Sequence, residues 1–349
     1  MTKAERRIQQ EAERRITERR DKAEAESRRL AAIRSQPVEQ FQRMPGQNLD
    51  RLKNVRGEYY TGDENFDRLA KAQNQQRPKP EQFRDVYPKE KLIADLTKVE
   101  RFKKSPGYQE ERGPEAIASE YLVNELISRG VFGKDAKAQL TADADDYFNH
   151  IDLAVTVTEA DSEPMFLGVD VTTKDDIQDH RRKLGQTIGE LKRNKLNTLE
   201  YYSNPEVPGV KGEVTLPRVV IDIQRDRVQA LQAAITSSEK FSIPADVQHE
   251  MLEEAILQLS QSAAFLLTEH YRAGEQLELN GGEPEEVIAF FHQHGLQVKR
   301  QDPELYENVM KHVKLLGYLL VQEKEKGPAT RDDVQGGALW KLVHEGKVY

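Results

Sequence analysis

Two aspartates stand inside stretches that otherwise read as β-strands. Asp152 lies in "HIDLAV" (150–155), and Asp170 lies in "FLGVDVTTKDD" (166–176). An unpaired carboxylate is unfavourable inside a strand, so each aspartate lies either on a solvated sheet face or in a site. Carboxylate oxygens are hard ligands that suit Mg²⁺ and related divalent cations. The chemistry to test is therefore metal binding.

Side-chain alternation separates both aspartates from the aliphatic rows of their strands. Alternate residues of a strand share a face. The aliphatic rows are Ile151, Leu153, Val155 and Val157 in the first strand, and Leu167, Val169 and Val171 in the second. "ADSEP" between the strands is a suitable hairpin connection. In an antiparallel pair, Asp152 and Asp170 would converge on one face, where they either meet solvent or bind a metal.

The elements that would position these aspartates follow one another from Gly113 onward. "GPEAIASEYLVNELISRGVFG" has Pro in its first turn, apolar residues at helical spacing and a glycine stop, which predicts an amphipathic helix. The pattern then predicts strands at 150–159 and 165–173, a long helix at about 176–203, a strand at 218–223 and a helix from near Asp226. This α-β-β-α-β-α order predicts an α/β domain at 113–240.

The rest of the chain divides into three further regions. Residues 1–34 form a charged helical arm, in which residues 3–34 carry eleven Lys/Arg against seven Asp/Glu and lack a core-facing apolar stripe. Residues 35–112 are polar and rich in proline, which indicates a linker with short helices. Residues 241–349 form an α-helical region, with helices expected at 244–272, 284–294 and 303–325.

Composition limits the functional classes. The chain has 349 residues, 37% hydrophobic and 32% charged, with a net charge of -8 and no cysteine. Disulfides, thiolate metal sites and a cysteine nucleophile are therefore excluded. The sequence has neither an 18-residue apolar run nor a secretory h-region, so no membrane partner and a cytoplasmic location are expected.

The order of helix, acidic strands, helix and strand resembles the core of the PD-(D/E)xK nuclease superfamily. "ASEYLVNELISRG", "HIDLAV" and "GVDVTT" are similar to its motifs over residues 113–227. The resemblance implies an αββαβα restriction-endonuclease-like core that hydrolyses DNA phosphodiester bonds with Mg²⁺ or Mn²⁺. It also implies that Glu120, Asp152, Asp170 and the carbonyl of Val171 bind the metal. Thr172 stands where the family has its lysine.

The missing lysine leaves two functional hypotheses. A threonine cannot supply the positive charge that an ammonium offers to a phosphoryl transition state. Because alternate residues of a strand share a face, Lys174 is favoured as the replacement for the missing lysine, and Lys183 on the next helix is the alternative. With such a charge the protein would be a nuclease acting on DNA in defence, repair or a mobile element. Without it, the chain would be an inactive nuclease-fold binding or scaffold protein, with the N-terminal arm available to a protein partner.

Four other features are interpreted as structural rather than functional. "DADDYFNHID" (143–152) crowds acids but lacks the features of a calcium loop, which favours a turn before the strand. His150 is interpreted as a hydrogen-bonded neutral side chain rather than a ligand. Asp222 is not expected to join the site. Tyr201 and Tyr202 are expected to pack at the end of the long helix.

Overall fold

The computed structural model shows a mixed α/β protein. It describes residues 63–105, 113–160, 162–172, 177–223, 243–271 and 283–326, together with 227, 228, 231, 232, 235 and 236. The predicted arm (1–34) and Lys174 lie outside the described residues. The α/β class expected from the sequence is therefore confirmed for the described part of the chain.

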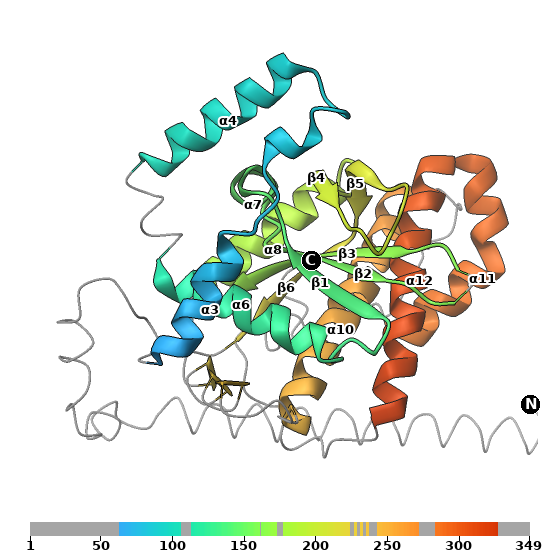
Figure 1. Cartoon of the computed structure of the whole chain (residues 1–349). Helices are drawn as coiled ribbons and strands as arrows, with labels where there is room; N and C mark the ends of the chain where they lie inside the picture. The colour runs from blue at the N-terminus through green and yellow to red at the C-terminus, as the bar shows by residue number, and fades with distance from the viewer. Residues whose placement is uncertain are drawn as a thin grey trace, which may run out of the picture. The chain divides into compact units, whose positions relative to one another are not determined.

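A four-stranded mixed sheet lies at the centre of the described structure, in the order β1-β2-β3-β6 (Figure 1). Its strands are β1 (Ala136–Leu140), β2 (Leu153–Val157), β3 (Met165–Thr172) and β6 (Arg218–Asp222). The pairs β1–β2 and β2–β3 are antiparallel, which confirms the predicted hairpin, and β3–β6 is parallel.

One face of the sheet is aliphatic and carries the main core. Its side chains are Leu153, Val155, Val157, Leu167, Val169, Val171, Val219 and Ile221, which belong to one buried cluster. Helix α6 (Pro114–Ser128) contacts β1 and β3 on this core, and α10 (Ala245–His270) contacts β6. Burial of these side chains contributes about 25 cal/mol of stabilisation per Å² of apolar surface, and this is the main interaction that holds the helices on the sheet.

The opposite face of the sheet packs against a second hairpin and α8 (Ile177–Leu191). The hairpin consists of β4 (Asn197–Ser203) and β5 (Lys211–Leu216). Gly168 makes this contact close, because a Cβ at this position would lie 2.7 Å from Leu216 Cδ1 and 3.2 Å from Ile151 Cγ2. Leu184 of α8 packs on Val220. Asp170 lies on this same face by strand alternation.

Two local expectations were wrong, and one strand was not predicted. The helix expected over about 176–203 ends at Leu191, and β4 follows, so Tyr201 and Tyr202 are buried in a strand. Both tyrosines do pack, as predicted. The strand β1 was not predicted, because "AKAQL" has little apolar alternation. The segment at 143–152 forms the helix α7 (Asp143–Asn149) rather than a simple turn. Ile151 precedes β2 and packs with the hairpin cluster.

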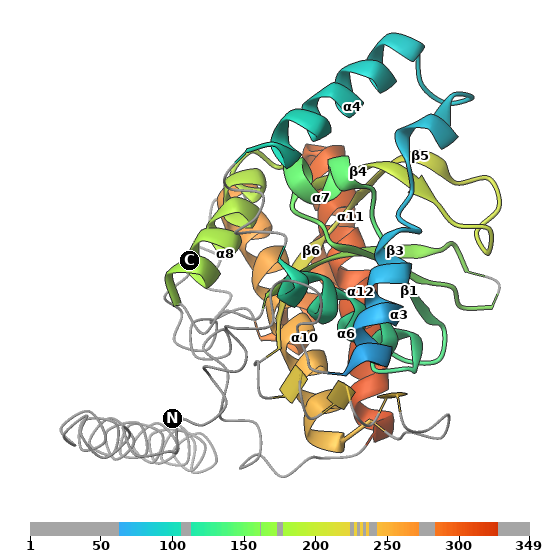
Figure 2. The same ribbon diagram turned by 60° about the vertical axis from the view of Figure 1, so that its left-hand side comes forward.

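Part of the segment expected as a linker packs against the core. Phe66 of α3 (Glu64–Asn74) makes an edge contact with Tyr121, at 5.0 Å between ring centroids. The short helix η2 (Pro80–Phe83) and α4 (Lys89–Lys103) follow, and α4 lies beside α7 (Figure 2). Apolar side chains shared by η2, α4, α7 and β4 form a buried cluster of their own.

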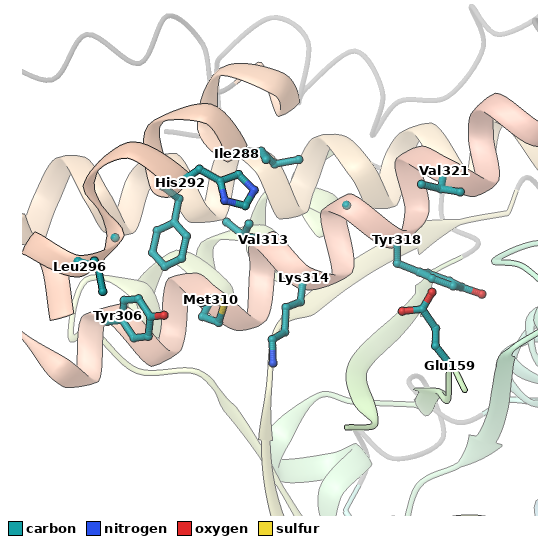
Figure 3. Close-up of a pocket in the computed structure, with 13 residues that line it drawn as sticks. Glu159, Ile288, His292, Leu296, Tyr306, Met310, Val313, Lys314, Tyr318 and Val321 are labelled. Atoms are coloured by element: carbon teal, nitrogen blue, oxygen red, sulfur yellow. The ribbon is translucent and has the colours of Figure 1, made fainter. Parts of the chain in front are cut away.

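The helices expected in the C-terminal region are confirmed in α10, α11 (Pro284–Gln301) and α12 (Pro303–Lys326). Helices α11 and α12 border an apolar pocket of about 480 Å³, in which Lys314 and Glu159 are charged residues at the wall (Figure 3). Within the described residues, no helix combines the length and the apolar character needed to cross a bilayer.

Gln258 of α10 covers the open edge of the sheet. Its Oε1 accepts from the Val220 N–H at 2.8 Å, and its Nε2 donates to the Val220 carbonyl at 2.7 Å. The side-chain amide thus takes the place of a neighbouring strand, since a sheet edge otherwise leaves its backbone groups unpaired.

We expect Gln258→Ala to lower the free energy of unfolding by about 2–4 kcal/mol, because two buried backbone groups lose their partners. Urea denaturation of the full chain measures the change. Gln301→Ala, at an exposed position on α11, is the control and should cost less than about 0.5 kcal/mol. Equal effects of the two substitutions would show that Gln258 does not support the edge.

Candidate metal centre

Three buried carboxylates meet beside the start of β2. One oxygen each from Glu120, Asp146 and Asp152 lies within 4.8 Å of the other two. All three residues are buried, at 4%, 8% and 9% exposure. Carboxylates this close together repel one another unless a cation offsets their charge or one of them is protonated. The cluster is therefore a candidate divalent metal site.

Glu120 is positioned by α6. Pro114 begins the helix at a position where its missing N–H costs nothing. Leu122 and Leu126 then fix the helix on the core and are fully buried. This packing leaves Glu120 buried beside the sheet and determines where its carboxylate lies.

Asp146 is positioned by α7, and the adjacent Asp145 anchors that helix. The Asp145 carboxylate accepts from the backbone N–H groups of Glu200 at 2.6 Å and Tyr201 at 3.0 Å. Burial raises the pKa of Asp145 to about 6, although these hydrogen bonds oppose the shift. Asp145 therefore ties α7 to β4, while Asp146 belongs to the acidic cluster.

Asp152 is held by the chain reversal between α7 and β2. Helix α7 ends at His150 in the left-handed conformation, with φ of 54°. The Thr141 N–H then donates to the Asp152 carbonyl at 3.0 Å, and the Asp152 N–H donates to the Val169 carbonyl at 2.9 Å. The Asp152 Oδ2 accepts from the Val171 N–H at 2.7 Å, which orients the carboxylate.

Arg77 supplies a buried cation to this cluster. Its guanidinium pairs with Glu120 and, at 2.7 Å, with Asp146 Oδ2. It also donates to the Thr141 carbonyl at 3.1 Å and to Asn74 Oδ1 at 2.7 Å. The arginine side chain therefore links the segment after α3 to both α6 and α7.

Asp170 lies in a separate pair with Lys183. The Lys183 Nζ is 2.5 Å from Asp170 Oδ1 and 2.8 Å from the Val171 carbonyl oxygen. Lys183 thus contacts two of the groups that were expected to bind metal, the Asp170 carboxylate and the Val171 carbonyl. Asp170 is absent from the three-carboxylate group found among the described residues.

Arg218 lies behind Asp170. Its guanidinium is 3.8 Å from Asp170 Oδ2 and donates to the Lys183 carbonyl at 2.7 Å. Burial lowers the pKa of Arg218, while Asp170 and Asp152 act in the opposite direction. An arginine nevertheless stays charged in a protein, so it adds a fixed positive charge to this side of the site.

The structure therefore brings together Glu120 and Asp152 from the expected set, and adds Asp146 and Arg77. Asp146 lies in an acidic segment that was expected to form a turn. Only the prediction of a helix at 143–149 would have indicated where the Asp146 side chain points. Thr172 is buried next to Asp222 in the β3–β6 pairing. His150, near Gln186 at 3.3 Å, is also outside the acidic cluster.

Asp222 belongs to a different carboxylate pair. Its N–H donates to Glu254 Oε2 at 3.3 Å, and both residues are buried. Burial raises the pKa of Glu254 well above its usual value, and the nearby Asp222 carboxylate adds to the shift. Within the described residues, the pair lies outside the three-carboxylate cluster, in keeping with the expectation for Asp222.

We expect Glu254→Gln to flatten the pH dependence of stability. A carboxyl group with a raised pKa in the folded state stabilises the fold fully below its unfolded value of about 4.3, and this contribution is lost as pH rises towards the folded value. Urea denaturation from pH 4 to pH 8 should therefore show the variant gaining on the wild type with rising pH. Parallel curves would contradict the assignment.

No family model, no curated protein and no solved structure matches the chain. Four carboxylates lie close to three cationic side chains: Glu120, Asp146, Asp152 and Asp170 against Arg77, Lys183 and Arg218. With all four carboxylates ionised, these groups carry a net charge of -1, and one divalent ion would change it to +1.

Proposed function

We propose that the protein is a metal-dependent hydrolase of DNA phosphodiester bonds with a PD-(D/E)xK-type core. The observation that carries the proposal is the convergence of Glu120, Asp146 and Asp152 from separate elements on one buried point. Hard oxygen ligands on a rigid framework suit Mg²⁺ or Mn²⁺. In the four-stranded sheet, the order α6, β1–β3, α8, β6 is consistent with the resemblance seen in the sequence and has one more strand than expected. Helix α7 and the β4–β5 hairpin are further additions.

In this proposal Glu120, Asp146 and Asp152 hold the metal. A bound divalent ion would stabilise negative charge on the phosphoryl oxygens and lower the pKa of a water nucleophile. The Val171 N–H keeps the Asp152 carboxylate oriented. Asp170 positions the ammonium of Lys183 beside this centre.

Lys183 supplies the charge that Thr172 cannot. Its Nζ contacts Asp170 and the Val171 carbonyl, which immediately precedes Thr172. The lysine comes from α8 rather than from β3, yet its ammonium reaches the same strand. This contact supports Lys183 as the group that stabilises the transition state or orients the water; Lys174 lies outside the described residues.

The surface of α8 favours a polyanionic substrate. Exposed basic side chains follow the helix and its C-terminal turn: Arg181, Arg182, Lys192, Arg193 and Lys195. Lys and Arg side chains supply most of the affinity for a phosphate backbone. This local charge offsets the net charge of -8 of the whole chain, and we infer that DNA approaches along α8.

A scaffold protein is the second candidate, and Arg77 is the observation that favours it. The guanidinium already pairs with two of the three clustered carboxylates, and Lys183 pairs with Asp170. Such buried ion networks also occur for structural reasons. In that case divalent metal would not bind, and the acids would serve only to join α6 and α7.

We expect Mn²⁺ to raise the melting temperature of the full chain, and Asp152→Asn to abolish the rise. Ligand binding to the folded state alone adds about 2.7 kcal/mol at 100-fold the dissociation constant. The asparagine keeps an acceptor for the Val171 N–H but removes a charged ligand. Thermal unfolding with and without millimolar Mn²⁺ measures the effect.

Asp85→Asn is the matched control for this measurement, because Asp85 is exposed and pairs with Lys211 away from the cluster. It should keep the full metal response. No response in either the wild type or Asp152→Asn would argue for the scaffold, and an equal rise in both would show that the metal binds away from Asp152.

A further inference from the structure

A polar cavity of about 440 Å³ opens between the end of α7, α8 and the start of β4. This volume lies within the range of small-molecule sites, about 300–1,000 Å³. Its wall combines amide, hydroxyl, aromatic and cationic side chains, among them Phe148, Gln186, Arg193, Asn197, Thr198 and Arg218. The pocket between α11 and α12 in Figure 3 differs, because aliphatic and aromatic residues form most of its wall.

The cavity is adjacent to the acidic centre. Arg218 lines it, is 3.8 Å from Asp170 Oδ2 and also interacts electrostatically with Asp152 of the three-carboxylate cluster. His150 lines it too, and is two residues from Asp152 in the chain. A ligand in the cavity would therefore lie next to a phosphodiester bound at the carboxylates.

Two polar atoms at the cavity wall lack a hydrogen-bond partner among the described residues. They are Nε of Arg218, a residue that is 3% exposed, and Oε1 of Gln186. Such an unsatisfied buried group costs about 1–3 kcal/mol. One is a donor and the other an acceptor, and both atoms are covered from solvent, so a ligand would satisfy them only if the covering side chains shifted.

Gly189 keeps the cavity wide on the side of α8. A Cβ at this position would have no heavy atom within 4 Å. Glycine within a helix costs about 1 kcal/mol relative to alanine, and packing inside the protein does not require it here. The missing side chain leaves room for a ligand.

We propose that this cavity binds one unpaired nucleobase of a DNA strand whose phosphodiester lies at the acidic centre. The inference rests on the proposed function and narrows its substrate to single-stranded or unpaired DNA. Asn and Gln side chains pair with the edges of bases. Lys98 Nζ covers one face of the Phe148 ring, at 3.6 Å from the centroid, so a base would stack on the other face. A base within a duplex is stacked and paired, so it would have to leave the helix to enter.

The test measures binding without cleavage. Full-length protein carrying Asp152→Asn is titrated, without added metal, against a labelled single-stranded oligonucleotide and against an abasic strand of the same length. Fluorescence anisotropy gives both affinities. Because the two strands have the same phosphates, the ratio of their affinities isolates the contribution of the bases. We expect the normal strand to bind about tenfold more tightly, in line with base stacking.

Gly189→Leu should fill the cavity and bring this ratio close to one, while raising the helix propensity of α8. Gly185→Leu is the matched control, because it lies one turn earlier on α8, also has open space at its Cβ and does not line the cavity. It should keep the ratio. Asn197→Ala should reduce the ratio as well, by removing an amide from the wall.

The two hypotheses fail in different ways. The nucleobase site is overturned if the affinity ratio of normal to abasic strand is the same in Gly189→Leu and Gly185→Leu. It is also overturned if the protein shows no base preference at all, even where the wild-type chain cuts DNA. Conversely, wild-type protein that prefers bases through this cavity but never cleaves DNA supports the site and contradicts the proposed hydrolysis.

Discussion

Lys183→Met is expected to lower DNA cleavage by about 10²- to 10³-fold, the usual effect of removing one group that stabilises transition-state charge. Methionine keeps an unbranched apolar stem but loses the ammonium that contacts Asp170 and the Val171 carbonyl. Cleavage of labelled single-stranded and linear duplex DNA with Mn²⁺ measures the change. The Mn²⁺ effect on melting temperature should persist, since Lys183 is not a ligand.

Lys192→Met, at an exposed position in the turn directly after α8, is the control and should retain most activity at low salt. Lys174→Ala tests the alternative lysine that strand parity indicates. Full cleavage by Lys183→Met together with loss of cleavage in Lys174→Ala would transfer the role to Lys174.

Arg77→Met is expected to have the largest effect on stability. Removing one partner of a buried ion pair costs about 3–5 kcal/mol, because it leaves the other charges buried and uncompensated. Here Glu120 and Asp146 would both lose their cation. Urea denaturation without metal should therefore show a large loss relative to the wild type.

Divalent metal should restore part of this stability. Without the guanidinium, Mn²⁺ can compensate the clustered carboxylates, so the variant should gain more from Mn²⁺ than the wild type gains. Arg129→Met, which breaks the more exposed pair with Glu125, should lose about 1 kcal/mol or less and show no extra gain. A variant that loses stability and does not respond to Mn²⁺ would identify Arg77 as the permanent cation of a structural network.

The fold was predictable where periodicity is strong. The paired strands around Asp152 and Asp170 alternate clearly, and α6, α10 and α12 have long apolar patterns. The error at 192–203 arose because "KRNKLNTLEYYS" follows a true helix without a glycine or proline stop. The positive φ of Asn194, at 53°, marks the real break, and local pattern does not predict it.

The site was predictable only in part, because its missing members depend on tertiary contacts. Side-chain alternation along the strand indicated Asp152, and the resemblance to the PD-(D/E)xK superfamily indicated Glu120. Arg77, however, lies 43 residues from Glu120 and 69 from Asp146 in the chain, within a stretch that resembles a linker. Its role depends on how α3 packs against α6. Likewise, the helical position of Lys183 lies away from the apolar face of α8, yet its flexible stem brings the ammonium back to β3.

The most direct measurement is anomalous diffraction at the manganese edge from crystals of the full chain grown with Mn²⁺. The account predicts one strong peak at roughly 2.0–2.6 Å from oxygens of Glu120, Asp146 and Asp152, the range for hard cations bound by carboxylates. A map without a peak at this point, with Arg77 still paired to Glu120 and Asp146 at saturating Mn²⁺, would contradict the metal centre and the proposed hydrolysis with it.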